Sequence, residues 1–267
     1  MKRTAILSSV MAAVMLAVSV TFGQEGENLW SSGTAHTLPQ GRWEKGLFQP
    51  LRFGLSDTKE LRLNPLISLL APHIHLKVSR RPVGGWQRAY RYGIISPTPL
   101  LRMVQRAGTG GFLADDPDIG EVPWMVMIRQ EVLLSRPWSR GLVTLKGGVA
   151  VALGAGDIDS RLQIELPVIY PRLALYHSGY QLNFGLDVSA QLSQRLVLLG
   201  DADLFFSPAL DGPAWEHKGM MQWNKSDRLQ LSFGYKLTYT PFPWGTQWHL
   251  IPLFDLQIAR QRGSERL

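Results

Sequence analysis

The 267-residue chain contains no cysteine, which excludes cysteine metal knuckles and agrees with export from the cytoplasm. It also lacks a phosphate-binding glycine loop. Beyond residue 20 it has no uncharged apolar segment long enough for a transmembrane helix. The mean hydropathy of −0.03 is that of a soluble chain, but the alternation of apolar and polar residues in a β-barrel cancels to the same value.

The first residues have the features of a secretory signal peptide. Lys2 and Arg3 precede an apolar run from Ala5 to Val20, and the small residue Gly23 follows as a cleavage site. A membrane anchor is the alternative, but the run is short for a span and no polybasic stop follows it. We therefore expect residues 1–23 to be removed on export.

The formal net charge is +7. The lysines and arginines are scattered singly through predicted strands and turns, which does not favour nucleic acid as a partner. Phosphates of outer-leaflet lipid and lipopolysaccharide, or an anionic solute, are the counterparts that fit this charge. Plain solvation of loops accounts for it equally well.

Apolar and polar residues alternate along many segments, as in strands with one oily face. In segment 181–192 every second residue is apolar, from Leu182 and Phe184 to Leu192. Counting gives about twelve strands, in a range of about ten to fourteen, and a closed bacterial barrel normally has an even number. Segment 161–180 is either one strand kinked at its prolines or two short strands. Further strands are predicted over residues 42–55, 60–69, 73–80, 86–95, 124–134, 142–153, 161–170, 195–206, 215–223, 228–239 and 248–258.

Many strands with scarcely any helix make a sandwich or a barrel, and two features favour a transmembrane antiparallel β-barrel. Most predicted strands have about nine to fourteen residues, against about five or six in soluble sheets and about nine to eleven in strands that cross a bilayer. Tryptophans and tyrosines also gather near strand ends, where aromatic girdles meet the membrane surfaces. We expect an all-β fold with its oily face in lipid: an N-terminal segment over 24–40, the barrel over 41–259 and a tail over 260–267. The girdle candidates are Trp43, Trp86, Trp124, Trp138, Trp215, Tyr239, Trp244 and Trp248.

One irregular region, residues 96–121, carries a predicted short helix. Pro97 and Pro99 precede it and Gly108 ends it, which is common helix punctuation. Two placements stay open: the helix folds into the mouth of the barrel as a plug or lid, or it packs on the rim. The candidate residues are Leu100, Leu101 and Val104 on one face, with Arg102 and Arg106 on another.

The segment TAHTLPQGRWEKGLFQPLRFGLSDTKELRLNPL, residues 34–66, resembles the opening of a family of poorly characterised bacterial outer-membrane β-barrel proteins. This family overlaps loosely with proteins of aromatic-degradation (meta-pathway) operons. Residues 97–112 look like a loop of the family and GLSD like a periplasmic turn, so the motifs cover about a fifth of the chain. The resemblance implies a barrel in the outer membrane and brings neither a substrate nor catalytic residues. In one departure, the chain ends in a charged tail, where such barrels often end on an aromatic residue that the assembly machinery reads. The matching residues are Thr37, Leu38, Pro39, Gly41, Glu44, Gly46, Leu47, Phe48, Pro50, Leu51, Arg52, Gly54, Leu55, Asp57, Glu60 and Leu61.

Candidate chemistry is sparse. His177 and Ser178 would be the base and nucleophile of a lipid-modifying enzyme, but adjacent strand residues point to opposite faces unless a turn at Gly179 relaxes this. His73 and His75 share a strand face suited to a metal, yet no third ligand is identifiable. The acidic run 115–118 lacks the spacing of a calcium loop. We therefore predict no catalytic residue, no metal and no cofactor.

The leading hypothesis is a passive, porin-like pore of a Gram-negative outer membrane for small hydrophobic or anionic solutes. Its partners would be outer-membrane lipid, lipopolysaccharide and the barrel-assembly machinery. Opposite charges inside a narrow barrel pair and block it equally well, giving a closed structural barrel. A lipid-modifying enzyme and a soluble periplasmic lipid-binding barrel are further alternatives. The candidate lumen-lining residues are Arg62, His73, His75, Lys77, Arg129, Glu131, Lys146, Asp187, Asp201, Asp203, Lys236 and Asp255.

Overall fold

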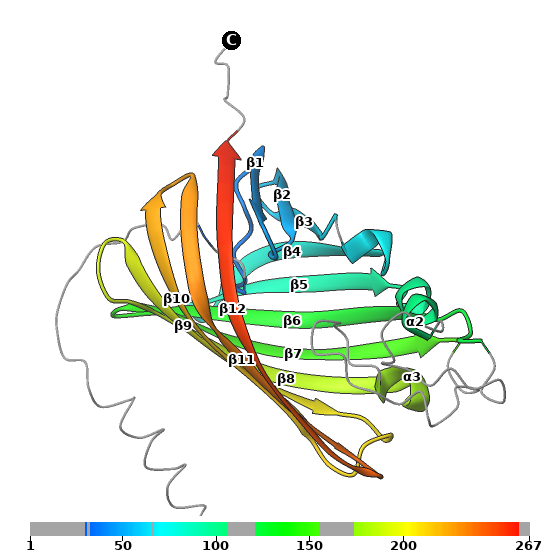
Figure 1. Ribbon diagram of the computed structural model, residues 1–267. Helices are drawn as coiled ribbons and strands as arrows, with labels where there is room; N and C mark the ends of the chain where they lie inside the picture. The colour runs from blue at the N-terminus through cyan, green and yellow to red at the C-terminus, as the bar shows by residue number, and fades with distance from the viewer. Residues whose placement is uncertain (1–29, 31–32, 66, 106–120, 155–173, 262–267) are drawn as a thin grey trace, which may run out of the picture.

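The computed structural model describes residues 30, 33–65, 67–105, 121–154 and 174–261. They form a closed barrel of twelve antiparallel strands, in which each strand pairs with its neighbours along the chain and β1 closes the ring against β12 (Figure 1). The prediction of an all-β antiparallel barrel is confirmed. The strands are β1 (Arg42–Gly46), β2 (Leu51–Ser56), β3 (Lys59–Leu63), β4 (His73–Val83), β5 (Trp86–Ile95), β6 (Val126–Trp138), β7 (Gly141–Leu153), β8 (Tyr180–Gln191), β9 (Leu196–Phe206), β10 (Ala214–Ser226), β11 (Leu229–Phe242) and β12 (Gly245–Gln261).

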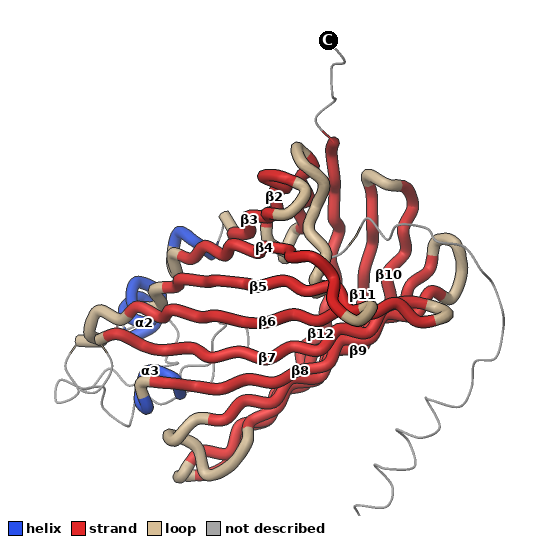
Figure 2. Tube along the Cα trace, turned by 180° about the vertical axis from the view of Figure 1, so that it is seen from behind, coloured by secondary structure: helices blue, strands red, loops and turns tan. Residues whose placement is uncertain are grey.

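The connections between strands distinguish the two ends of the barrel. Short turns join β2 to β3, β4 to β5, β6 to β7, β8 to β9 and β10 to β11 at the end where β1 begins and β12 finishes, here called the turn end. The opposite loop end carries the 3-10 helix η1 (Ile67–Leu69) and the helices α2 (Thr98–Gln105) and α3 (Ala174–Ser178), all seen at one side of the barrel in Figure 2. Within the described ranges, no helix is both long and apolar enough to cross a membrane.

Two predicted strands are wrong in extent. Segment 42–55 forms two strands, because the chain turns at residues 47–50, where the carboxylate of Asp255 accepts hydrogen bonds from main-chain N–H groups. The strand predicted over 60–69 ends at Leu63, because the side-chain oxygen of Asn64 accepts a hydrogen bond from the N–H of Ile67 and begins η1.

Segment 161–180 contains a helix that the alternation did not predict. Residues 174–178 form α3, and Gly179 adopts a left-handed φ of 81° that lets the chain turn from the helix into β8. The strand predicted over 161–170 and the run 115–118 lie outside the described residues, as do the predicted signal peptide and the end of the tail.

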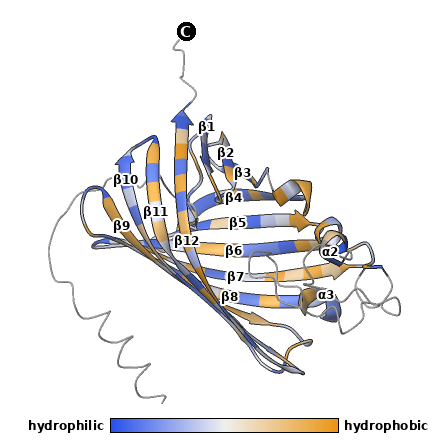
Figure 3. Cartoon of the chain, in the orientation of Figure 1, coloured by the Kyte–Doolittle hydropathy of each residue, from blue (hydrophilic) through white to orange (hydrophobic). Residues whose placement is uncertain are grey.

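The oily faces of the strands look outward. Phe184 is 54% exposed, and Leu182 and Leu231 are exposed as well, whereas Asn183 and Ser232 on the opposite faces are buried within the barrel. Figure 3 shows the result as apolar and polar bands that alternate along the strands. The polar residues therefore line the inside, the inverse of a soluble sandwich.

The aromatic girdle candidates lie near both ends of the strands. Trp215, Tyr239 and Trp248 pack against one another on the outer surface near the loop end, with ring centroids 4.6 to 6.0 Å apart. By strand position, Trp43, Trp86 and Trp138 lie near the turn end, and Trp124, Trp215, Tyr239, Trp244 and Trp248 near the loop end.

Candidate functional site: a charged lumen

The barrel encloses a cavity of about 1820 Å³. Its wall includes Asn64 and His73 at the loop end and Arg140 and Gln194 at the turn end, so the cavity reaches both ends of the barrel. Inward-facing residues of the strands supply most of the wall, and many of them are charged.

One charged cluster joins the first four strands. Arg42 and Arg52 both bind Glu44, at 2.9 and 2.8 Å, and Arg52 also binds Glu60 at 2.9 Å. The ammonium group of Lys77 lies 3.2 Å from the same Glu60 carboxylate. All five side chains are at most 5% exposed, and each carboxylate bridges two cations, which offsets the cost of removing these charges from water.

The N-terminal segment 33–40 lies against the inner wall of the barrel. The N–H of Ala35 donates to the Ser135 hydroxyl, 2.8 Å away, and the N–H of Leu38 donates to Glu60 over 3.1 Å. Ala35 and Leu38 are both completely buried. The segment has no strand pattern and was predicted to lie outside the barrel domain, but the structure places it inside the lumen as part of the wall.

A second charged cluster lies on β5 and β6. Glu131 accepts from Nε of Arg91 at 2.6 Å, from the guanidinium group of Arg129, and from the side-chain amide of Asn183 at 3.1 Å. A Cβ at Gly148 would collide with Glu131 and Asn183, so only glycine leaves room for their contact.

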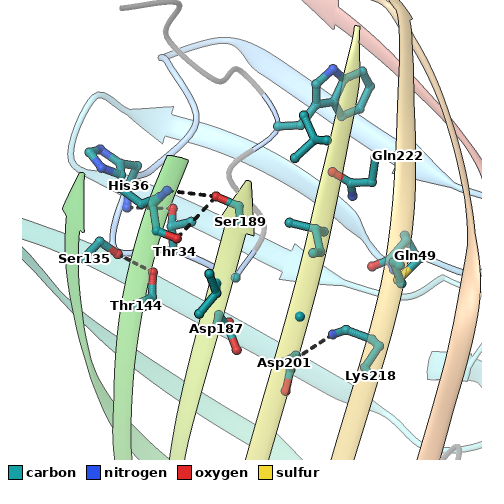
Figure 4. Close-up of a pocket in the computed structure, with 18 of the residues that line it drawn as sticks. Thr34, His36, Gln49, Ser135, Thr144, Asp187, Ser189, Asp201, Lys218 and Gln222 are labelled. Atoms are coloured by element: carbon teal, nitrogen blue, oxygen red, sulfur yellow. Dashed lines mark hydrogen bonds and ion pairs between the residues drawn. The ribbon is translucent and has the colours of Figure 1, made fainter. Parts of the chain in front are cut away.

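A third cluster surrounds Lys146 on β7. Its ammonium group lies 2.6 Å from Asp187, 2.7 Å from Asp203 and 3.4 Å from Asp201. Asp201 also accepts from Lys218 at 2.7 Å, the pair marked by a dashed line in Figure 4. Three carboxylates thus share two lysines, and this wall of the lumen carries excess negative charge.

Two predicted lumen residues support the backbone of irregular segments. Asp255 accepts from the N–H groups of Phe48 and Gln49, at 3.0 and 3.2 Å. The imidazole of His73 accepts from the N–H of Asn64 at 3.0 Å through Nε2, while Nδ1 lies 2.8 Å from the carbonyl oxygen of Ala71. Both nitrogens of His73 are therefore engaged, which leaves it no lone pair for a metal.

The predicted lumen residues lie on the inner wall of the barrel, but they are spread over several strands and do not form one cluster. Lys77 is buried against Glu60, and Lys236 binds Glu216 at 3.0 Å. The residues that border the cavity are Arg62, His73, His75, Arg129, Glu131, Lys146, Asp187, Asp201, Asp203, Lys236 and Asp255.

The loop end is covered on one side by α2 and α3. Leu101 of α2, with Leu175 and Tyr176 of α3, packs in one buried cluster with the inward-facing Met127 and Ala150. Burial raises the pKa of the Tyr176 hydroxyl. The two helices thus fold over the inner face of the wall.

The other candidate plug residues of α2 lie beside the Leu101 contact. Arg102 donates to the carbonyl oxygen of Val122 at 2.7 Å and stacks on the Trp124 ring, while Leu100 is half-buried. Arg106 and the side chain of Val104 lie outside what the structure describes.

The pair considered for lipid chemistry is held in α3. The Ser178 hydroxyl lies 2.7 Å from the Ser207 hydroxyl and within 3.2 Å of the Ala174 carbonyl oxygen, contacts that fix the end of the helix. No group of three or more metal-binding side chains occurs among the residues of the described ranges.

Several charged residues of the lumen were not predicted from the sequence: Arg42, Glu44, Arg52, Glu60, Arg91, Glu216 and Lys218. The alternation in sequence could have identified Arg91 as a lumen residue, because Arg91 shares a strand face with Ala89 and Gly93, opposite the exposed Tyr92. No protein-family model matches the chain, and neither does any curated protein.

Proposed function

We propose that this chain is a bacterial outer-membrane β-barrel that acts as a passive pore for small solutes. The observation that carries the proposal is the charged cavity whose wall reaches both ends of a barrel with an oily outer surface. An apolar outer surface is stable in hydrocarbon, and a polar lumen offers a hydrated path across it.

The lengths of nine of the twelve strands support membrane insertion, and β1–β3 are shorter. Strands β4 to β12 have 10 to 17 residues, enough to cross a bilayer when tilted, whereas β1, β2 and β3 have only 5, 6 and 5. At the loop end of these short strands, Phe48 and Leu69 expose 62% and 78% of their surface. We infer that these apolar turns complete the oily surface.

The backbone of these turns also fits a lipid environment. The N–H groups of residues 47 to 49 bond to the Leu256 carbonyl and the Asp255 carboxylate, and those of Ile67, Ser68, Leu70 and Ala71 bond within their own turn. Irregular backbone is tolerated at membrane depth only when its polar groups are paired in this way.

A closed structural barrel is the second candidate, favoured by one observation. Segment 33–40 occupies part of the lumen, and buried ion pairs cross-link the wall around it. Both functions fit an outer-membrane barrel. They differ in whether ions pass through the lumen.

Conductance across planar bilayers tests the pore. We expect stepwise currents from the refolded protein, and larger steps after deletion of residues 33–39. If neither this variant nor one lacking residues 97–121 conducts, although both show the heat-modifiable migration of a folded barrel, the pore is rejected and the closed barrel stands.

A further inference from the structure

The lumen is electrically polarised across its width. The buried and half-buried inward charges of β1–β6 carry an excess of three positive charges, and those of β7–β12 an excess of two negative charges. The first group is Arg42, Arg52, Arg62, Lys77, Arg91 and Arg129 with Glu44, Glu60 and Glu131; the second is Lys146, Lys218 and Lys236 with Asp187, Asp201, Asp203, Glu216 and Asp255.

Two of these arginines, Arg62 and Arg129, lie in one lateral row of the wall. Arg62 pairs in register with His75, His75 with Gly93, and Gly93 with Arg129, across β3, β4, β5 and β6. Neighbouring strands lie about 4.8 Å apart, so Arg62 and Arg129 flank a span of about 14 Å. Gly93 contributes no side chain, and the His75 ring occupies that position, because a Cβ at Gly93 would collide with the ring.

The carboxylates near this row are already bound to cations, among which is Arg129 but not Arg62. Glu60 binds Arg52 and Lys77, and Glu131 binds Arg91 and Arg129. Arg62 borders the cavity and, among the residues that the structure describes, makes no hydrogen bond or ion pair. A guanidinium group that faces the lumen and makes no direct ion pair can bind an anion, because it presents paired N–H donors to a carboxylate or phosphate.

The opposite side of the same cavity carries apolar side chains among its charged ones. In the ring of twelve strands, β10 lies six positions from β4. Leu199 of β9, Met220 of β10, and Ile251 and Leu253 of β12 all border the cavity. A solute that spans the lumen from Arg62 can therefore place an apolar body against these four side chains.

We propose that the lumen holds a binding site for a small organic anion, a carboxylate on an apolar body. Arg62 binds the charged group beside His75, and the patch of Leu199, Met220, Ile251 and Leu253 contacts the apolar body. The proposal deepens the proposed function by naming the solute class, and it rests on that function for its role in transport. The binding step itself also takes place in a barrel that does not conduct.

Calorimetric titration of the folded protein in non-ionic detergent tests the site, with hexanoate, 1-hexanol and acetate as probes and protein-free micelles as the blank. Hexanoate should bind most tightly, because 1-hexanol lacks the charge and acetate lacks the apolar body. Arg62→Gln should weaken hexanoate binding at least about tenfold, the effect of losing a hydrogen bond to a charged group.

Two variants control for the loss of one positive charge. Lys236→Gln removes a lumen cation from the opposite wall, and Arg195→Gln removes one from an exposed turn. Both should bind hexanoate within about threefold of the unmodified protein, and heat-modifiable migration shows that each variant is folded.

Four results would overturn the site: no hexanoate binding by folded protein, equal binding of hexanoate and 1-hexanol, unchanged binding by Arg62→Gln, or equal weakening by Lys236→Gln. None of these depends on current, so failure of the site and failure of the pore are told apart.

Discussion

The main-chain N–H of Leu38 donates a hydrogen bond to Oε2 of Glu60, 3.1 Å away. The same carboxylate binds Lys77, whose ammonium group donates to the carbonyl oxygens of Thr34 and His36. One buried ion pair on β3 and β4 therefore holds the N-terminal segment in the lumen. This contact gives the first prediction.

Glu60→Gln should loosen segment 33–40, and Glu44→Gln should not. Both carboxylates are 2% exposed and bind two cations each, but only Glu60 contacts the segment. With His36→Cys as reporter, we expect a water-soluble maleimide to react about tenfold faster in the Glu60 variant, since a hydrogen bond to a charged acceptor is lost. Equal labelling rates in the two variants would show that Glu60 does not hold the segment.

Lys146→Met should destabilise the barrel. The substitution leaves Asp187, Asp201 and Asp203 in the wall with Lys218 as their remaining cation, and breaking a buried ion pair costs about 3 to 5 kcal/mol of unfolding free energy. Urea unfolding in lipid vesicles, followed by tryptophan fluorescence, measures the change. The exposed Lys225→Met is the control, and a loss no larger than the control's would contradict the prediction.

The ring of Tyr176 should contribute to the stability of the fold, and its hydroxyl should not. The ring is buried in the cluster under α3, so Tyr176→Ala should cost about 3 to 5 kcal/mol of unfolding free energy. The hydroxyl has no hydrogen-bond partner within the described ranges, so Tyr176→Phe should be neutral or stabilising.

The same residue gives a pH dependence. Burial raises the pKa of Tyr176 in the folded state, while the unfolded phenol ionises above about pH 10. The stability present below that pH is therefore lost as the pH rises, because only the unfolded state gains from ionisation. Tyr176→Phe should lessen this alkaline loss relative to the unmodified protein in unfolding titrations between neutral and alkaline pH, and identical pH profiles would refute the assignment.

A charge on the outer face should be costly in the middle of a strand and cheap at its end. Phe184 lies outward near the middle of β8, and Leu192 lies on the same side just past its turn end. Phe184→Arg should cost about 2 to 4 kcal/mol of unfolding free energy in vesicles, and Leu192→Arg about 0 to 1. Equal costs would mean that depth in the bilayer plays no part.

The alternation of apolar and polar residues predicted the fold well where strands are long. The predicted strand 86–95 has the bounds of β5, and the expected outward direction of Leu182 and Phe184 is what the structure shows. Alternation along each strand gave the inward direction of Lys146, Asp187 and Asp201, and the pairing of β7, β8 and β9 brings them together on one wall.

Features that depend on contacts between residues far apart in the chain could not be predicted from the sequence. The turn at 47–50 relies on Asp255, about two hundred residues later, and is fixed only when β12 closes against β1. Segment 33–40 has no periodic pattern, and its position depends on Ser135 and Glu60. Ile67 and Leu69 extend the alternation of Leu61 and Leu63 in sequence, but the Asn64 side chain begins a 3-10 turn instead.

The central claim is that the apolar face of the strands contacts lipid. The chain has no cysteine, so spin labels can be placed one at a time, at Phe184→Cys and Leu231→Cys on the outer face and at Ser189→Cys on the cavity wall. In lipid vesicles, we predict that oxygen relaxes the two outer labels more strongly than a water-soluble nickel chelate does, and that the chelate is the stronger at Ser189. Outer labels that respond to the chelate as solvent-exposed residues do, or to neither reagent, would contradict the account.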